Sequence, residues 1–324
     1  MKNIRCDEDR DDIFYNRLSS FLFRKGRLDT KKISTLKPRV YYVETFNNGL
    51  LVLKAHKSKE SVAQQWSFFN KIKGRGSNSV LFKLFPNGKE VIECNTYIWT
   101  ISPYMSGKKV NYRSSEERRS VVAALKKFHK CATGIKIKPM KKNTLITERW
   151  YNRLNTFKKT EYIFIENGFE NLYMDIVHLT EKYLLKLSRL PWSISEMKAI
   201  ERGTWIHGDV ASHNFIINKQ IYLIDFDLLA CRPQIYDFIQ LSQRFLPYIQ
   251  WNLDSLLAYE MTNSENMRRF LLGTLLPTDV IREWIYFISH KSNQAILNYL
   301  VKMDLKWEKR KIFSQRADIV LKLI

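Results

Sequence analysis

Apolar residues along the first hundred positions follow two different periods. Residues 11–24 and 58–72 carry apolar side chains three and four positions apart, which predicts two amphipathic helices. Residues 40–45 and 50–54 are instead rich in β-branched and aromatic residues. They flank Asn47-Asn48-Gly49, a hairpin signal because asparagine and glycine tolerate positive φ. This part of the chain is therefore expected to mix helices with antiparallel strands.

Three more β-rich runs are predicted at residues 80–85, 90–94 and 97–101. Pro86-Asn87-Gly88 joins the first two as a turn. Together with the hairpin, these runs predict a small antiparallel sheet with one internal helix. The segment 103–107 then interrupts the pattern.

The remaining positions are mostly helical in period. Ser114, followed by Glu117, has the spacing of a capping box at a helix start. Helical patterns continue to about Leu323 and enclose one β-rich patch at residues 204–227. The order of the elements predicts an α+β protein with two lobes. The expected division is a β-rich lobe at residues 1–102, a linker at 103–107 and a helical lobe at 108–324.

Composition excludes several classes of protein. The residues are 45% hydrophobic and 13% aromatic, enough to build a core. The first residues are charged where a secretory signal would be apolar. The most apolar region, residues 280–301, is interrupted by charges, which predicts a core helix and no membrane span. The four cysteines form no C-x-x-C pair, which argues against zinc and favours a reducing, cytoplasmic location.

The formal net charge of +22 favours the capture of anions. The basic residues are spread along the chain and form no dense tail. A solvated basic surface therefore explains them at least as well as a groove for a polyanion. A nucleic-acid-binding module rests on charge alone, because no binding motif accompanies it, and no specific nucleic-acid partner is expected.

The segment 204–227 holds the candidate chemistry. Two short apolar runs flank Asn218-Lys219-Gln220, which predicts a hairpin. Asn214 precedes the first run, and Asp225 follows the second. Because a hairpin brings its two ends together, we expect these side chains to converge on one cation.

The residue types in this segment suit phosphoryl transfer. That reaction needs a carboxylate to orient the attacking hydroxyl, and oxygen ligands to hold Mg²⁺ against the phosphates. Asp209, with Asn214 five residues later, has the spacing of a kinase catalytic loop. Asp225-Phe226-Asp227 takes the place of the metal-binding Asp-Phe-Gly. An ordinary surface loop is the bland alternative, and the paired motifs in this order argue against it.

His207-Gly208-Asp209-x4-Asn214 and Ile224-Asp225-Phe226-Asp227 resemble the catalytic segment of the aminoglycoside phosphotransferase and choline kinase superfamily. The resemblance extends to three other segments: Leu51-Val52-Leu53-Lys54, Leu125-x-x-Phe128-His129 and Pro233-x-x-Tyr236-Asp237. Within the superfamily, the layout looks closest to the kinase-like proteins of the bacterial spore coat. The resemblance implies a protein-kinase-like fold with a nucleotide-binding, antiparallel β lobe.

The resemblance also implies roles for individual residues. Asp209 would be the catalytic base, Asn214 and Asp225 would be ligands of Mg²⁺, and Lys54 would contact the α- and β-phosphates of ATP. Two residues would be structural: His207, bracing the loop, and Asp237. Two roles stay open for Asp227: it would bind a second metal ion or cap a turn.

The chain departs from the family pattern in two places. Ser34-Thr35-Leu36-Lys37-Pro38-Arg39 stands where a glycine-rich loop would lie, so Lys37 or Arg39 would have to contribute charge instead. The acidic partner of Lys54 is also unclear, since the next helix offers only Glu60, Gln64 and Gln65.

Two main hypotheses for function follow. One is an ATP- and Mg²⁺-dependent phosphotransferase acting on a hydroxyl of a small molecule or of a cell-surface or spore-coat component. The other is a non-catalytic kinase-fold protein that takes part in spore coat structure or assembly. In either case the resemblance places other spore coat proteins among the candidate partners, and the spore coat beside the cytoplasm as a location.

Overall fold

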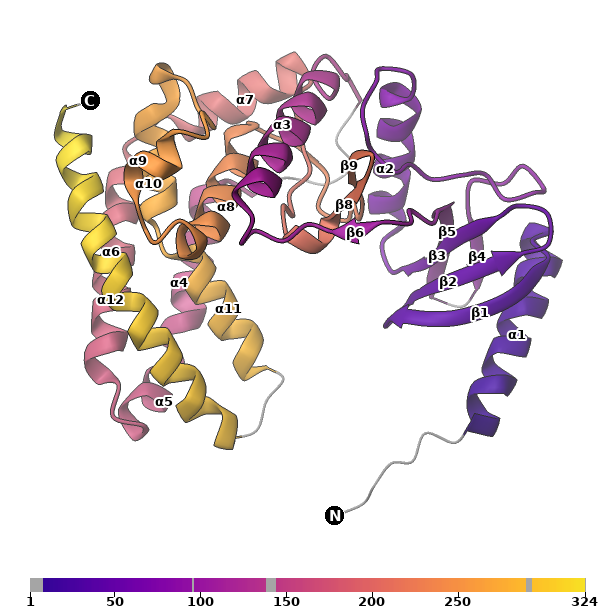
Figure 1. Ribbon diagram of the computed structural model, residues 1–324, viewed down its shortest axis with the longest axis horizontal. Helices are drawn as coiled ribbons and strands as arrows, with labels where there is room; N and C mark the ends of the chain where they lie inside the picture. Colours follow the sequence, from indigo (N-terminus) through magenta and orange to yellow (C-terminus); the bar gives the residue numbers. More distant parts are fainter. Residues whose placement is uncertain (1–7, 95, 138–143, 290–292, 324) are drawn as a thin grey trace. The chain divides into compact units, whose positions relative to one another are not determined.

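The computed structural model describes residues 8–94, 96–137, 144–289 and 293–323 (Figure 1). These residues form two compact units. The first contains residues 8–94, 96–109, 137 and 216–227, and the second contains the other described residues. The expected lobe boundaries at 102 and 108 stay predictions.

The first unit is built on a five-stranded antiparallel sheet with the strand order β1-β2-β3-β5-β4. Its elements are α1 (Glu8–Gly26), β1 (Thr30–Lys37), β2 (Val40–Thr45), β3 (Leu50–His56), α2 (Lys59–Ile72), β4 (Ile92–Cys94) and β5 (Tyr97–Pro103). A separate three-stranded sheet, ordered β6-β8-β9, joins β6 (Lys108–Lys109), β8 (Phe215–Asn218) and β9 (Gln220–Leu223). The predicted hairpin around residue 219 is therefore present.

The period of two along β3 separates its core residues from its functional residues. Leu51, Leu53 and Ala55 lie in a buried cluster with Leu18 and Leu22 of α1. Successive side chains of a strand point to opposite faces, so Lys54 and His56 lie on the other face. Lys54 is placed by its register, opposite Val40 of β2 and Thr100 of β5.

The predicted helices at 11–24 and 58–72 and the hairpin at 40–54 are confirmed. The prediction of a strand at 80–85 is wrong, because this segment makes only isolated bridges, such as Lys83 to Ile101. β4 pairs with residues 97–99 of β5, and the bridge from Lys83 lies just beyond that stretch. β1 was not predicted, because its sequence has no alternation of apolar and polar residues. Most of its side chains are exposed, as is common for a strand at the edge of a sheet.

The second unit is mainly helical (Figure 1). Ser114 caps its first helix by accepting a hydrogen bond from the Glu117 N–H, as predicted, while the Glu117 carboxylate accepts from the Asn111 N–H. Two short strands pair antiparallel: β7 (Trp205–Ile206) and β10 (Ala230–Cys231). The helices are α3 (Ser115–Cys131), α4 (Ile146–Lys158), α5 (Glu161–Glu166), α6 (Glu170–Ser188), α7 (Trp192–Arg202), α8 (Ile235–Phe245), α9 (Leu253–Leu257), α10 (Met267–Leu275), α11 (Thr278–Ile288) and α12 (Asn293–Leu323), with 3₁₀ turns at Ser212–Asn214, Leu246–Tyr248 and Ser264–Asn266.

The apolar region at 280–301 is not the single core helix expected, because α11 ends at Ile288 and α12 begins at Asn293. An apolar run with charged interruptions does not distinguish one long helix from two. Among the described residues, no helix combines the length and apolar character needed to cross a membrane. The expected fold class, α+β with an antiparallel N-terminal sheet and a helical C-terminal part, is confirmed.

Candidate active site

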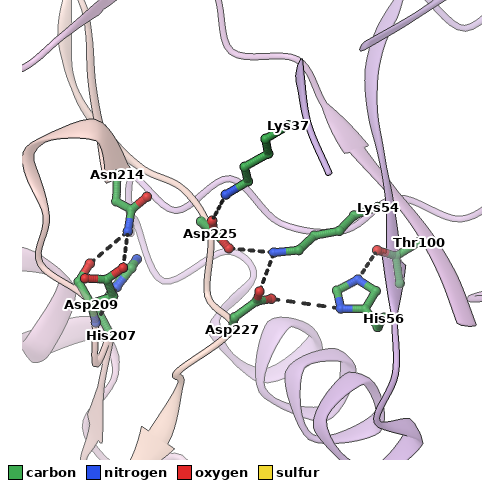
Figure 2. A network of polar contacts seen from close by, with 9 residues as sticks. All are labelled: Lys37, Lys54, His56, Thr100, His207, Asp209, Asn214, Asp225 and Asp227. Atoms are coloured by element: carbon green, nitrogen blue, oxygen red, sulfur yellow. Dashed lines mark hydrogen bonds and ion pairs between the residues drawn. The ribbon is translucent and has the colours of Figure 1, made fainter. Parts of the chain in front are cut away.

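Lys54 is held by two carboxylates from the segment that follows β9 (Figure 2). Its Nζ lies 2.6 Å from Asp225 Oδ1 and 2.6 Å from Asp227 Oδ2. Lys37, at the end of β1, places its Nζ 2.7 Å from the other oxygen of Asp225. Both oxygens of the predicted metal ligand are thus engaged by lysine ammonium groups, at positions where a metal cation could bind.

Asp225 adopts an unusual backbone conformation, with a φ of 64°. A residue other than glycine in this region carries strain, which surrounding contacts must offset. The next residue, Phe226, is buried and packs edge-on against Phe69 of α2 at a centroid distance of 5.4 Å. This anchor holds the Asp225 and Asp227 backbone beside Lys54.

The two lysines determine the charge of Asp225. Burial alone would raise the pKa of this carboxyl. The nearby charge of Lys54, with hydrogen bonds from Lys37 and Lys54, outweighs burial and lowers the pKa below its ordinary value. Asp225 is therefore ionised at neutral pH and suited to a hard cation.

A cavity of about 420 Å³ opens beside Lys54 within the first unit. A volume of this size suits a small ligand. Its walls carry the cations Lys37, Arg39, Lys54 and Lys57 and the hydroxyls of Ser58 and Ser61. Ser58 also caps α2, because its Oγ accepts the Ser61 N–H at 3.1 Å. The positive end of that helix and the basic side chains make the cavity attractive to phosphate.

His56 lines the same cavity as a neutral imidazole. Burial first, and then the charge of Lys54, lower its pKa to about 4. Its Nε2 lies 2.9 Å from Thr100 Oγ1, and its Nδ1 lies 3.9 Å from Asp227 Oδ1. The latter contact is not an ion pair at neutral pH, since the ring carries no charge there.

In the second unit, Asp209 and Asn214 lie in contact within one loop (Figure 2). Asn214 Nδ2 donates to Asp209 Oδ2 at 3.1 Å and to the Asp209 carbonyl at 3.0 Å. Arg244 of α8 donates to Asp209 Oδ1 at 3.0 Å. The Asp209 side chain is still 34% exposed, so a substrate can reach it.

Asp237 braces this loop from α8. Its fully buried carboxylate accepts hydrogen bonds from the N–H groups of His207 at 2.8 Å and Gly208 at 2.9 Å. His129 Nε2 lies 2.9 Å from the same carboxylate. Gly208 has a φ of 84°, and a Cβ there would lie 2.3 Å from the Leu228 carbonyl oxygen. The His-Gly-Asp motif therefore satisfies a backbone requirement, and the geometry agrees with structural roles for His207 and Asp237.

The predicted site residues thus form two local groups. Lys54 contacts Asp225 in the first unit, and Asp209 contacts Asn214 in the second. The convergence of Asn214 and Asp225 on one cation involves both units and stays a prediction. Sequence reasoning missed Arg244, which belongs to no motif used to search the chain.

Several solved structures share the fold of this chain. An aminoglycoside phosphotransferase from Alicyclobacillus acidocaldarius has a TM-score of 0.73 at 13% identity, over 93% of this chain and 95% of its own. An amicoumacin kinase with AMP-PNP and Ca²⁺ has a TM-score of 0.61 at 13% identity, over 95% and 94%. A spectinomycin phosphotransferase with ADP and spectinomycin has a TM-score of 0.58 at 10% identity, over 93% of both chains. No curated protein sequence matches the chain.

These likenesses establish the class of fold, that of kinase-like phosphotransferases. The family is shown by sequence. The profile described as the phosphotransferase enzyme family matches residues 34–270, well over half of the chain. This chain therefore belongs to that family. The expected closeness to the spore coat kinase-like proteins stays a prediction.

Proposed function

We propose that this protein is an ATP- and Mg²⁺-dependent phosphotransferase that acts on a hydroxyl group of a small molecule. The observation that carries the proposal is the braced loop at 207–214. There an ionisable carboxylate is partly exposed while its backbone is locked by Asp237. A rigid loop with an accessible carboxylate suits a group that must orient a hydroxyl.

Asp209 accepts the proton of the attacking hydroxyl in this proposal. Hydrogen bonds from Arg244 and Asn214 engage one oxygen each of its carboxylate and so fix the plane of the group. Each carboxylate oxygen can accept more than one hydrogen bond, so both donors leave room for a substrate hydroxyl.

Lys54 and Lys37 bind the phosphates of ATP in this proposal. Lys54 projects from β3 into the basic cavity, and Lys37 reaches the same carboxylate from β1. The turn between β1 and β2 contains Pro38 and Arg39, and it has no glycines to bring backbone amides close to a phosphate. Two lysine side chains would replace those amides.

The oxygen donors present fit Mg²⁺. Asp225 supplies an ionised carboxylate, and Asn214 points its Nδ2 at Asp209, which leaves its carbonyl oxygen for a cation. Mg²⁺ prefers such hard oxygen ligands and completes its shell with phosphate and water. When bound, the ion would neutralise charge on the transferring phosphoryl group.

Calorimetry with the full chain tests the proposal, first with ATP in the presence of Mg²⁺ and then with ATP in EDTA. Metal-dependent binding, followed by phosphorylation of a hydroxyl compound in a metabolite screen, is the expected result. Absence of Mg·ATP binding would overturn the proposal.

A non-catalytic role in spore coat structure or assembly is the second candidate. It is favoured by the absence of glycines from the β1–β2 turn and by the lysine pairing of both Asp225 oxygens. Mg·ATP binding without transfer to any acceptor would support this role. If the protein is instead catalytic, a hydroxyl of a cell-surface or spore-coat component is the other acceptor to screen.

A further inference from the structure

Four arginines gather on three helices of the second unit. Arg149 and Arg153 are four residues apart on α4, which places them on one face of that helix. Arg282 lies on α11, which packs against α4, and Arg244 lies on α8, which also packs against α11 (Figure 1). These four residues are the arginine cluster.

The charges of neighbouring members of the cluster act on one another. Burial of the Arg153 side chain, followed by the charges of Arg149 and Arg282, lowers its pKa to about 10. Burial also lowers the pKa of Arg244, and the charge of Arg282 is the next contribution. Arg282 thus acts on both neighbours. Each guanidinium group carries hydrogen-bond donors and a positive charge and has no acceptor.

The cluster has more hydrogen-bond donors than acceptors. Among the residues that the structure describes, the side chains of Arg149, Arg153 and Arg282 have no hydrogen-bond or ion-pair partner, and that of Arg149 is exposed to solvent. Arg244 bonds to Asp209, but its Nε is buried without an acceptor in the same described part of the chain. Buried donors are normally satisfied, so the unpartnered Nε points to an acceptor that a ligand would bring.

Nearby carboxylates do not neutralise the cluster. Glu196 is already paired with Arg232 at 2.9 Å. Glu283 follows Arg282 on α11, where burial first, and then the charge of Asp279, raise its pKa. Even counted as ionised, it offsets only one further arginine. Asp209 balances only one of the four arginines. The site retains an excess of positive charge.

We infer that the hydroxyl acceptor carries an anionic group, a phosphate or a carboxylate, which the arginine cluster binds. Planar guanidinium groups match both anions with paired hydrogen bonds. Arg244 links the two functions, because it contacts the candidate base while its Nε remains unpartnered. A cationic acceptor would instead meet repulsion from all four arginines.

The reaction would follow from this placement, and it rests on the proposed function through the role of Asp209. The hydroxyl oxygen forms a bond to the γ-phosphorus of ATP, and the bond from that phosphorus to the β–γ bridging oxygen breaks. ADP leaves with the electron pair, and the hydroxyl proton passes to Asp209. The anionic group of the acceptor takes no part in the bond changes and fixes the orientation of the hydroxyl.

Four sugars of similar size test the inference: glucose 6-phosphate, gluconate, glucose and glucosamine. Their binding to the full chain is measured by calorimetry without nucleotide. The variants are Arg153→Gln and Arg282→Gln, with Arg316→Gln as the control because it removes the same charge from an exposed position on α12. Arg153→Lys keeps the charge and loses only the planar fork, so it covers the case in which the glutamine variant fails to fold.

An anionic sugar should bind about tenfold more tightly than glucose, as expected for hydrogen bonds between charged groups. Which of the two anionic sugars binds more tightly identifies the phosphate or the carboxylate. Arg153→Gln and Arg282→Gln should each lose about tenfold in that affinity, Arg153→Lys should lose less, and Arg316→Gln should match the wild type.

Three results would overturn the inference: equal binding of glucosamine and the anionic sugars, unchanged anion binding in Arg153→Gln and Arg282→Gln, or no anion binding at about 10 mM. Mg·ATP binding is measured separately on the same proteins. Anion binding through Arg153 without Mg·ATP binding would reject the proposed phosphotransfer and retain the anion site. Mg·ATP-dependent phosphorylation of glucosamine in preference to gluconate would reject the anion site and retain the proposed phosphotransfer.

Discussion

Replacing Lys37 with methionine tests two roles of this residue. It pairs with Asp225 in the absence of ligand, and in the proposed function it binds a phosphate of ATP. In the structure its Nζ lies 2.7 Å from Asp225 Oδ2, and 53% of the Lys37 side chain is exposed. Exposure weakens such a pair to about 0.2–1 kcal/mol, because water screens the charges. Loss of a cation that competes for this carboxylate should therefore raise the affinity for free Mg²⁺ by about 1.4- to fivefold.

The same substitution should weaken ATP binding. In the proposed function, Lys37 replaces backbone amides that a glycine-rich loop would offer to phosphate. A hydrogen bond between charged groups contributes about 1.5–3 kcal/mol, so the affinity for Mg·ATP should fall by about tenfold or more. The two affinities then move in opposite directions, which simple damage to the fold would not produce.

Calorimetric titration with Mg²⁺ alone and with Mg·ATP measures both effects. Lys32→Met is the matched control, because Lys32 is exposed on the same strand and makes no ion pair among the described residues. Equal Mg·ATP affinity in Lys37→Met and the wild type would refute the phosphate role. A weaker affinity for free Mg²⁺ in Lys37→Met than in the wild type would refute the idea that Lys37 competes with Mg²⁺ for Asp225.

Three further predictions follow from the site. Asp225→Asn removes a ligand charge and should weaken Mg·ATP binding markedly by calorimetry; unchanged affinity would contradict the metal assignment. Asp209→Ala should retain Mg·ATP binding and lose about 10²–10⁴-fold in turnover, measured with the acceptor that the screen identifies; retained turnover would exclude it as the base. The pKa of His56 is lowered from 6.5 to about 4, so its unfolded form binds the proton more readily. This residue therefore stabilises the fold fully above about pH 6.5 and loses that contribution, about 3 kcal/mol at most, as the pH falls toward 4. The free energy of unfolding in urea should fall less steeply between pH 6.5 and 4 in His56→Gln than in the wild type. His178→Gln is the control because His178 is exposed. The same pH dependence in His56→Gln and the wild type would refute the lowered pKa of His56.

Local patterns were sufficient to predict much of the first unit. The hairpin at 40–54 and the helix at 58–72 could be predicted, because turn preferences and apolar periods act between residues close in sequence. The strand predicted at 80–85 is wrong for the opposite reason: strand formation needs a ladder of pairs with residues distant in sequence, and this segment makes only isolated bridges, such as Lys83 to Ile101.

The sequence by itself determined the chemical character of the candidate site, since Asp209, Asn214 and Asp225 stand at motif spacing within one short segment. Only the tertiary structure decided their partners. Lys54 meets Asp225, 171 residues away, and Arg244 meets Asp209, 35 residues away. Such contacts depend on how strands and helices pack, and no period or motif encodes them. The same holds for the arginine cluster, whose members lie on three helices and converge only when α4 and α8 pack against α11.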